Sequence, residues 1–166
     1  MNIIFKRRTI RKFLNQEVEP EKLKQLIEAA VMAPSAGNQQ PWQFIVVSSR
    51  EILNKLSQAT PNAKPLLEAS AAIIVVGDLE RETRQGFWVQ DCSAATMNIL
   101  LQATALDLGS VWIGVYPREE RMANVTAILN LPVYAIPLCM IGIGYPAEQK
   151  ETPNRFNEEI IHYDTW

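Results

Sequence analysis

The sequence is poor in the residues that metal sites and nucleophilic enzymes use most. Its 166 residues include one histidine, His162, and two cysteines, Cys92 and Cys139, which lie far apart and in no paired motif. A Cys/His zinc site needs about four such ligands, so these three do not suffice. A Ser-His-Asp system would depend on a histidine near the end of the chain, where polypeptides commonly fray. The sequence therefore argues against a metal centre and against a hydrolase of this kind.

Neither sign of charge dominates the chain. The 16 basic and 18 acidic residues leave a net charge of -2, with a pI of about 5.5. This balance excludes a positive electrostatic field over the whole molecule that would attract a nucleic acid or a membrane surface, although a local basic patch remains possible. The uncharged stretch 122–147 contains three prolines and two glycines. Such breakers indicate a buried strand with turns rather than a membrane-spanning helix. We expect neither a nucleic-acid nor a membrane partner.

Targeting segments and linkers are also scarce. The apolar run at residues 1–5 is too short for the hydrophobic region of a secretory signal peptide. We therefore expect a cytoplasmic, reducing location in which both cysteines stay free, and the sequence leaves their redox role open. Without repeats or flexible linkers, a chain of this length with 48% hydrophobic residues is expected to form one domain over residues 1–166.

Apolar periodicity predicts intermixed helices and strands, which is typical of an α/β or α+β protein. The predicted helices cover residues 20–32, a short segment after Ser48 or Ser49, and residues 86–108 and 118–129. The predicted strands cover residues 43–47, 71–76, 111–115 and 138–143. The polar tail 151–166 carries several apolar side chains, so we expect it to dock on another surface.

The predicted helix 86–108 is apolar on nearly all sides. It has no charged residue between Asp91 and Asp107. A helix of this kind must be covered nearly all round, which is difficult for a monomer of this size. The pattern favours a dimer that shares the helix, with a central helix wrapped by its own chain as the alternative.

Two motifs suggest phosphate binding. Residues 142–147 match the G-x-G-x-x-A form of a dinucleotide fingerprint, but too little chain follows for a helix and a returning strand. We interpret this motif as a strand end.

Residues 6–12 hold five positive charges, with no acid before Glu17. Arginine's planar fork suits phosphate oxygens, and Thr9 adds a hydroxyl. A solvated basic turn or a weak nucleic-acid patch is the alternative.

The segment 34–42, Pro-Ser-Ala-Gly-Asn-Gln-Gln-Pro-Trp, suits a flat ligand. Small residues let a backbone approach a ligand closely. Asn38 and Gln40 offer donors and acceptors of the kind that the edge of a heterocycle requires. The two prolines limit the freedom of the loop and so lower the cost of ordering it on binding. An ordinary capped turn is the alternative.

In their order and spacing, these segments resemble the FMN-dependent nitroreductase family. Each motif is weak alone, whereas five in order are specific and cover nearly the whole chain. The matching segments are residues 7–13, 33–42, 91–101, 111–114 and 142–146, with Arg155 in the tail. The resemblance implies an α+β fold, a three-layer α-β-α sandwich with a mainly antiparallel central sheet, in a domain-sharing homodimer. The tail from about residue 150 to 166 would dock on the partner.

The resemblance also implies which residues bind FMN. A basic group would hold the phosphate and ribityl chain, with Arg11 toward the ribityl and pyrimidine side and Arg155 completing the phosphate clamp. Its members are Arg7, Arg8, Thr9, Arg11 and Arg155. Thr9 stands where serine is usual in the family, and its hydroxyl is retained.

The flavin ring would lie between two further segments. Four residues of the partner subunit would contact it: Pro34, Ser35, Ala36 and Asn38. Three residues would line the isoalloxazine, with backbone N–H groups near N5: Trp112, Ile113 and Gly114. The chain is short for the family and lacks the helical insertion that covers the substrate pocket in longer members, which leaves the acceptor undetermined.

The implied activity is that of an FMN-dependent NAD(P)H oxidoreductase. NADH or NADPH would give a hydride to the flavin and leave, and a nitroaromatic, quinone or similar small-molecule acceptor would then take its place in a ping-pong cycle. Because the flavin carries the chemistry, we expect no catalytic side chain. Arg11 would stabilise the anionic reduced flavin. The alternatives are a flavin-fragmenting or reductively dehalogenating member of the family, or a non-catalytic flavin-binding sensor.

Overall fold

The structure, a computed structural model that describes residues 2–166, is organised around the strand β2 (Ala71–Asp78). All eight residues of β2 are buried. Successive side chains of a strand point to opposite faces, so a strand that is apolar throughout must be covered on both sides. The sequence-based prediction of a strand buried on both faces is confirmed.

Four strands form one antiparallel sheet in the order β1-β2-β4-β3. The other three strands are β1 (Trp42–Val47), β3 (Gly109–Gly114) and β4 (Ala135–Gly144). β1 and β3 are the edge strands, so one side of each backbone is not paired with another strand of this sheet. The edge at β3 becomes important for the site described below.

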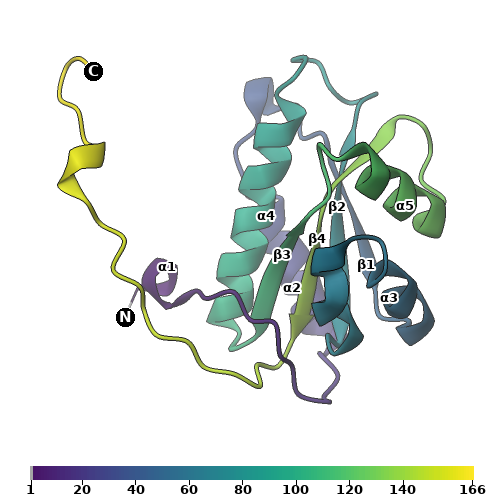
Figure 1. The fold of residues 1–166 in the computed structure, drawn as a ribbon. Helices are drawn as coiled ribbons and strands as arrows, with labels where there is room; N and C mark the ends of the chain where they lie inside the picture. The colour runs from purple at the N-terminus through teal and green to yellow at the C-terminus, as the bar shows by residue number, and fades with distance from the viewer. Residues whose placement is uncertain (1) are drawn as a thin grey trace.

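Helices cover both faces of the sheet (Figure 1). One face packs against α2 (Pro20–Ala30) and α4 (Trp88–Ala105), and the other against α3 (Arg50–Leu56), α5 (Glu119–Leu129) and the 3-10 segment η2 (Pro61–Leu67). Ile73 of β2 lies in the first core and Ile74 in the second. The predicted α+β class with three α-β-α layers and an antiparallel sheet is confirmed.

Two parts of the fold differ from the sequence-based prediction. β4 begins at Ala135 rather than at Leu138, because a bulge accommodates Pro137 opposite Val76. Proline has no N–H to give to a strand ladder, and a bulge is one of the few places where a sheet tolerates it. The segment η2 was missed, since its two prolines and short length leave no clear helical period.

Within the chain, α4 packs against the sheet, α2 and the short helix α1 (Ile3–Lys6), and few of its residues are exposed. Cys92 and Ile99 are fully buried against the sheet, whereas Met97 is 42% exposed on another side of the helix. None of the helices within residues 2–166 is long and apolar enough to cross a membrane.

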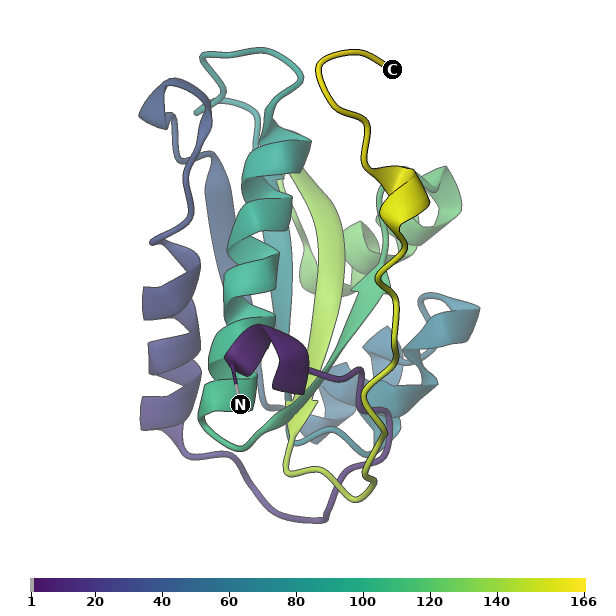
Figure 2. The ribbon, with the colours of Figure 1, turned by 90° about the vertical axis from the view of Figure 1, so that its left-hand side faces the viewer.

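The tail leaves the body of the molecule after Lys150. Figures 1 and 2 show it as an extended segment with one short turn, η3 (Glu158–Ile160). Its large apolar side chains are exposed: Phe156, Ile160, Ile161, Tyr163 and Trp166. Such a chain of exposed anchors indicates a surface that the protomer itself does not provide.

Candidate functional site

The basic segment near the N-terminus runs along the ends of β3 and β4. Thr9 forms a parallel bridge with Ser110, and the Ile10 N–H donates to the Ser110 carbonyl at 2.9 Å. This close approach depends on Gly109, because a Cβ at that position would lie 2.7 Å from the Ile10 side chain. The local sequence thus fixes the strongly basic residues 6–12 at one edge of the sheet.

The beginning of the tail is bonded to this basic segment. Glu148 Oε1 accepts hydrogen bonds from the backbone N–H of Arg11 at 2.6 Å and of Lys12 at 3.3 Å. These bonds, that of Arg11 above all, lower the pKa of Glu148. Lys150 Nζ donates to the Thr9 carbonyl at 2.7 Å. The two ends of the chain are therefore joined before the tail departs.

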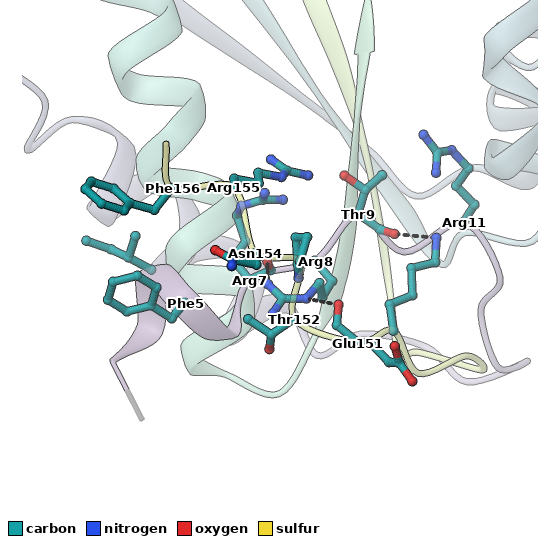
Figure 3. Close-up of a pocket in the computed structure, with 13 residues that line it drawn as sticks. Phe5, Arg7, Arg8, Thr9, Arg11, Glu151, Thr152, Asn154, Arg155 and Phe156 are labelled. Carbon is teal, nitrogen blue, oxygen red and sulfur yellow. Dashed lines mark hydrogen bonds between the residues drawn. The ribbon is translucent and has the colours of Figure 1, made fainter. Parts of the chain in front are cut away.

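A cavity of about 800 Å³ lies between the two joined segments (Figure 3). All five residues of the predicted phosphate and ribityl group line it: Arg7, Arg8, Thr9, Arg11 and Arg155. Figure 3 shows the Arg7 and Arg155 side chains next to each other, with Phe5 and Phe156 at one end. Partial burial, followed by the charges of Arg155 and Arg8, lowers the pKa of Arg7. An anion placed beside Arg7 would stabilise its charged form against both effects.

Arg8 differs from the other three arginines because the backbone already uses its donors. Its Nε donates to the Glu151 carbonyl at 2.8 Å and its Nη1 donates to the Arg7 carbonyl at 2.6 Å. The guanidinium groups of Arg7, Arg11 and Arg155, by contrast, form neither a hydrogen bond nor a salt bridge within the part of the chain that the structure describes. Arg8 therefore shapes the cavity wall, and the other three arginines are the cations available to a ligand.

A second cavity, of about 570 Å³, lies along the edge strand β3. Trp112, Ile113 and Gly114 line it together with Arg11. The Ile113 side chain is buried in the core, so this residue offers its backbone rather than its side chain. Because Arg11 borders both cavities, the cluster of arginines and the edge of the sheet form one continuous surface.

Sequence reasoning missed the residues that η2 contributes to this second cavity. Asn62, Lys64 and Glu68 line it alongside two prolines. The polar residues set between Pro61 and Pro65 were the only local signal. Their place opposite β3 depends on a contact between distant segments, which no local pattern reveals.

The predicted ring-contacting loop lies elsewhere in the protomer. Pro34, Ser35, Ala36 and Asn38 belong to a loop that contains the 3-10 turn η1 (Ala36–Asn38) and packs beside the first turns of α4. The structure does not bring this loop to either cavity of its own chain. The arginines and β3 therefore meet within one protomer. The loop 34–42, which we call the amide loop, does not join them there.

Known proteins with similar sequences and structures identify the family. The sequence matches the Nitroreductase family over residues 4–74 and 58–145. A protein of Archaeoglobus fulgidus, provisionally named as an NADH dehydrogenase/NAD(P)H nitroreductase, is 45% identical over 170 residues, which cover 100% of this chain and 98% of that protein.

Two solved structures show the same fold. An FMN-dependent nitroreductase of Clostridium difficile R20291 is 34% identical with a TM-score of 0.93, over 99% of both chains. A provisionally named nitroreductase of Desulfovibrio desulfuricans, in complex with FMN, is 28% identical with a TM-score of 0.86, over 99% of this chain and 95% of that one. The resemblance seen in the sequence is confirmed, and the chain belongs to the nitroreductase family.

Proposed function

We propose that this chain binds FMN and uses it to reduce nitroaromatic compounds, quinones or similar acceptors with NADH or NADPH. The observation that carries the proposal is the continuous surface from Arg7 and Arg155 through Arg11 to the edge of β3. Its charged end at the arginines suits an anionic tail, and its other end along β3 suits a flat ring. The names of the similar proteins, which include FMN reductases and NAD(P)H nitroreductases, support the same activity.

The arginine cavity suits the phosphate end of FMN. Arg7 and Arg155 would donate charge-assisted hydrogen bonds to phosphate oxygens, and the Thr9 hydroxyl would add a neutral one. A phosphate dianion would also relieve the repulsion that lowers the pKa of Arg7. Arg8 would keep the wall in place through its bonds to the backbone.

The cavity along β3 suits the ring of FMN. When bound, FMN supplies the two-electron chemistry, which no side chain of this protein needs to perform. The exposed edge of the strand at Trp112–Gly114 would present backbone N–H groups to the ring. Arg11 would place a fixed positive charge beside the position where negative charge develops on reduction, which stabilises that charge.

We further propose that the site is completed in a homodimer, in the cytoplasm. The loop residues Pro34, Ser35, Ala36 and Asn38 of the partner subunit would close over the ring, since they are remote from the cavities of their own chain. The exposed tail anchors, together with the exposed Met97 of α4, provide apolar surface for such a contact. Cys92 and Cys139 are free, in agreement with a reducing compartment.

The absorption spectrum of the purified protein tests this proposal. We expect a yellow protein that releases FMN on denaturation and loses its visible absorbance when NADH or NADPH is added without oxygen. Colourless protein that cannot be reconstituted with FMN would overturn the proposal. A bound flavin that neither donor reduces would instead identify a flavin-binding sensor.

A further inference from the structure

The side chain of Gln39 joins three segments of the protein. Its Nε2 donates to Asp91 Oδ2 at 2.7 Å, and its Oε1 accepts from the backbone N–H of Thr83 at 2.9 Å and of Arg84 at 2.7 Å. The other oxygen of Asp91, Oδ1, accepts from the backbone N–H of Ala36 at 3.0 Å. Asp91 lies in the first turn of α4 and is 5% exposed. The network therefore ties the amide loop to α4 and to the loop 79–87.

The amide loop needs such support because its backbone is strained. Gly37, Asn38 and Gln40 have positive φ angles of 57°, 55° and 48°. Residues other than glycine adopt this conformation only where their surroundings hold it. Ser35 Oγ accepts from the Gln40 N–H at 3.0 Å, which is a bond within the loop. The bonds that Asp91 accepts connect the loop to α4, and the Asp78 N–H, which donates to the Pro41 carbonyl at 2.7 Å, connects the end of the loop to β2.

The same network fixes the loop between β2 and α4. With its backbone held by Gln39, Arg84 packs on Gly37, where a Cβ would lie 3.1 Å from Nε. Gly37 thus lets a guanidinium lie directly on the loop that we propose to face the flavin. A change at Gln39 should disturb two surfaces together, that of the amide loop and that of residues 79–87.

We propose that Gln39 and Asp91 are positioning residues for electron transfer. They hold the backbone of Ala36–Asn38 in the conformation that contacts the ring, and they hold Arg84 of the loop 79–87 against Gly37. This inference rests on the proposed function, in which the amide loop of one subunit covers the flavin bound by the other. Neither residue touches the reacting atoms in this account.

Reversing the polarity of the hydrogen bond tests the inference. D91N leaves one acceptor oxygen where two donors, the Ala36 N–H and Gln39 Nε2, need one each, so one bond of the network is lost. Q39E sets one carboxyl group against another and breaks the bond between the two side chains. In the double variant D91N/Q39E, the new amide donates to the new carboxylate, whose other oxygen still accepts from Thr83 and Arg84. The double variant also keeps the original charge. E19Q is the control, since Glu19 accepts a hydrogen bond from the Tyr145 hydroxyl at 2.8 Å, away from both loops.

Three quantities should be measured for each variant: the Kd of FMN, the KM and kcat for a nitro acceptor, and the unfolding temperature. We expect each single variant to weaken FMN binding about ten-fold, as for one lost hydrogen bond to a charged group, and to raise the acceptor KM. The double variant should return to within about three-fold of the wild type by the same reasoning. E19Q should leave FMN affinity and KM unchanged.

The inference is wrong if the single variants bind FMN and acceptor as the wild type does. It is also wrong if the double variant binds FMN no more tightly than the weaker-binding single variant. The same holds if a drop in unfolding temperature alone accounts for the losses of FMN affinity. If a single variant does not fold, recovery of native FMN affinity in the double variant supports the inference, and no recovery contradicts it. A wild-type protein that binds no FMN would instead refute the proposed function.

Discussion

The arginine cavity predicts a loss of affinity that depends on the phosphate group of the ligand. R155Q removes one of the three arginines, Arg7, Arg11 and Arg155, that line the cavity and whose guanidinium has no hydrogen bond or salt bridge in the described chain. A hydrogen bond to a charged group contributes about 1.5–3 kcal/mol, which corresponds to a change of about 10- to 150-fold in Kd. Arg155 is exposed, so solvent screening favours the lower end of this range. Its removal also relieves the repulsion on Arg7, which reduces the loss further.

We therefore expect R155Q to weaken FMN binding about ten-fold and R7Q/R155Q to weaken it by more than either single change. Titration with riboflavin, which lacks the phosphate, separates this effect from a general loss of the site. The affinity for riboflavin should not change, and the difference between the two ligands should shrink as salt is added. K24Q, on α2 and away from both cavities, is the control that also removes one positive charge. Equal losses for FMN and riboflavin, or unchanged FMN affinity in the double variant, would refute the assignment of the phosphate site.

Two further predictions concern the core. G77A places a Cβ in collision with the buried Trp88 ring and should lower the free energy of unfolding by about 1–3 kcal/mol. G114A meets open space and should change it by less than about 0.5 kcal/mol. Urea denaturation measures both, and equal effects would contradict the packing described here. Burial raises the pKa of Cys92 and of Cys139 to about 12, so neither native thiol should react with a disulfide reagent at pH 8. Because unfolded thiols ionise near pH 8.5 and release protons there, stability should fall as the pH rises from about 9 toward 12, by up to about 1.4 kcal/mol per thiol for each pH unit. If a variant with alanine at both cysteines shows the same fall, the thiols are not its cause.

The parts of the fold that could be predicted are those that local patterns determine. The run of small and branched apolar residues at 71–76 predicts a buried strand, and Pro20 followed by apolar residues at helical spacing predicts α2. The start of β4 could not be predicted, because Pro137 breaks a strand unless its pairing with the neighbouring strand contains a bulge. The bulge places Leu138 of β4 opposite the step from Val75 to Val76 without a partner of its own, and those residues lie about 60 positions earlier in the chain.

The candidate site was predictable to the extent that family motifs name its residues. The motifs indicated the arginines and the β3 segment, and the structure brings these together at neighbouring cavities. They did not indicate Glu148, whose carboxylate holds the backbone of the basic segment, nor Asn62 of η2. Both act through contacts between segments far apart in the sequence. The same is true of Gln39, whose neighbours in the sequence do not reveal its bond to Asp91.

A crystal structure of the dimer with FMN would test the central claim most directly. The account predicts the phosphate between Arg7 and Arg155 and the ring along Trp112–Gly114. It also predicts that the amide loop of the partner subunit closes over the ring. A flavin bound away from the arginines, or one enclosed by a single protomer, would contradict it.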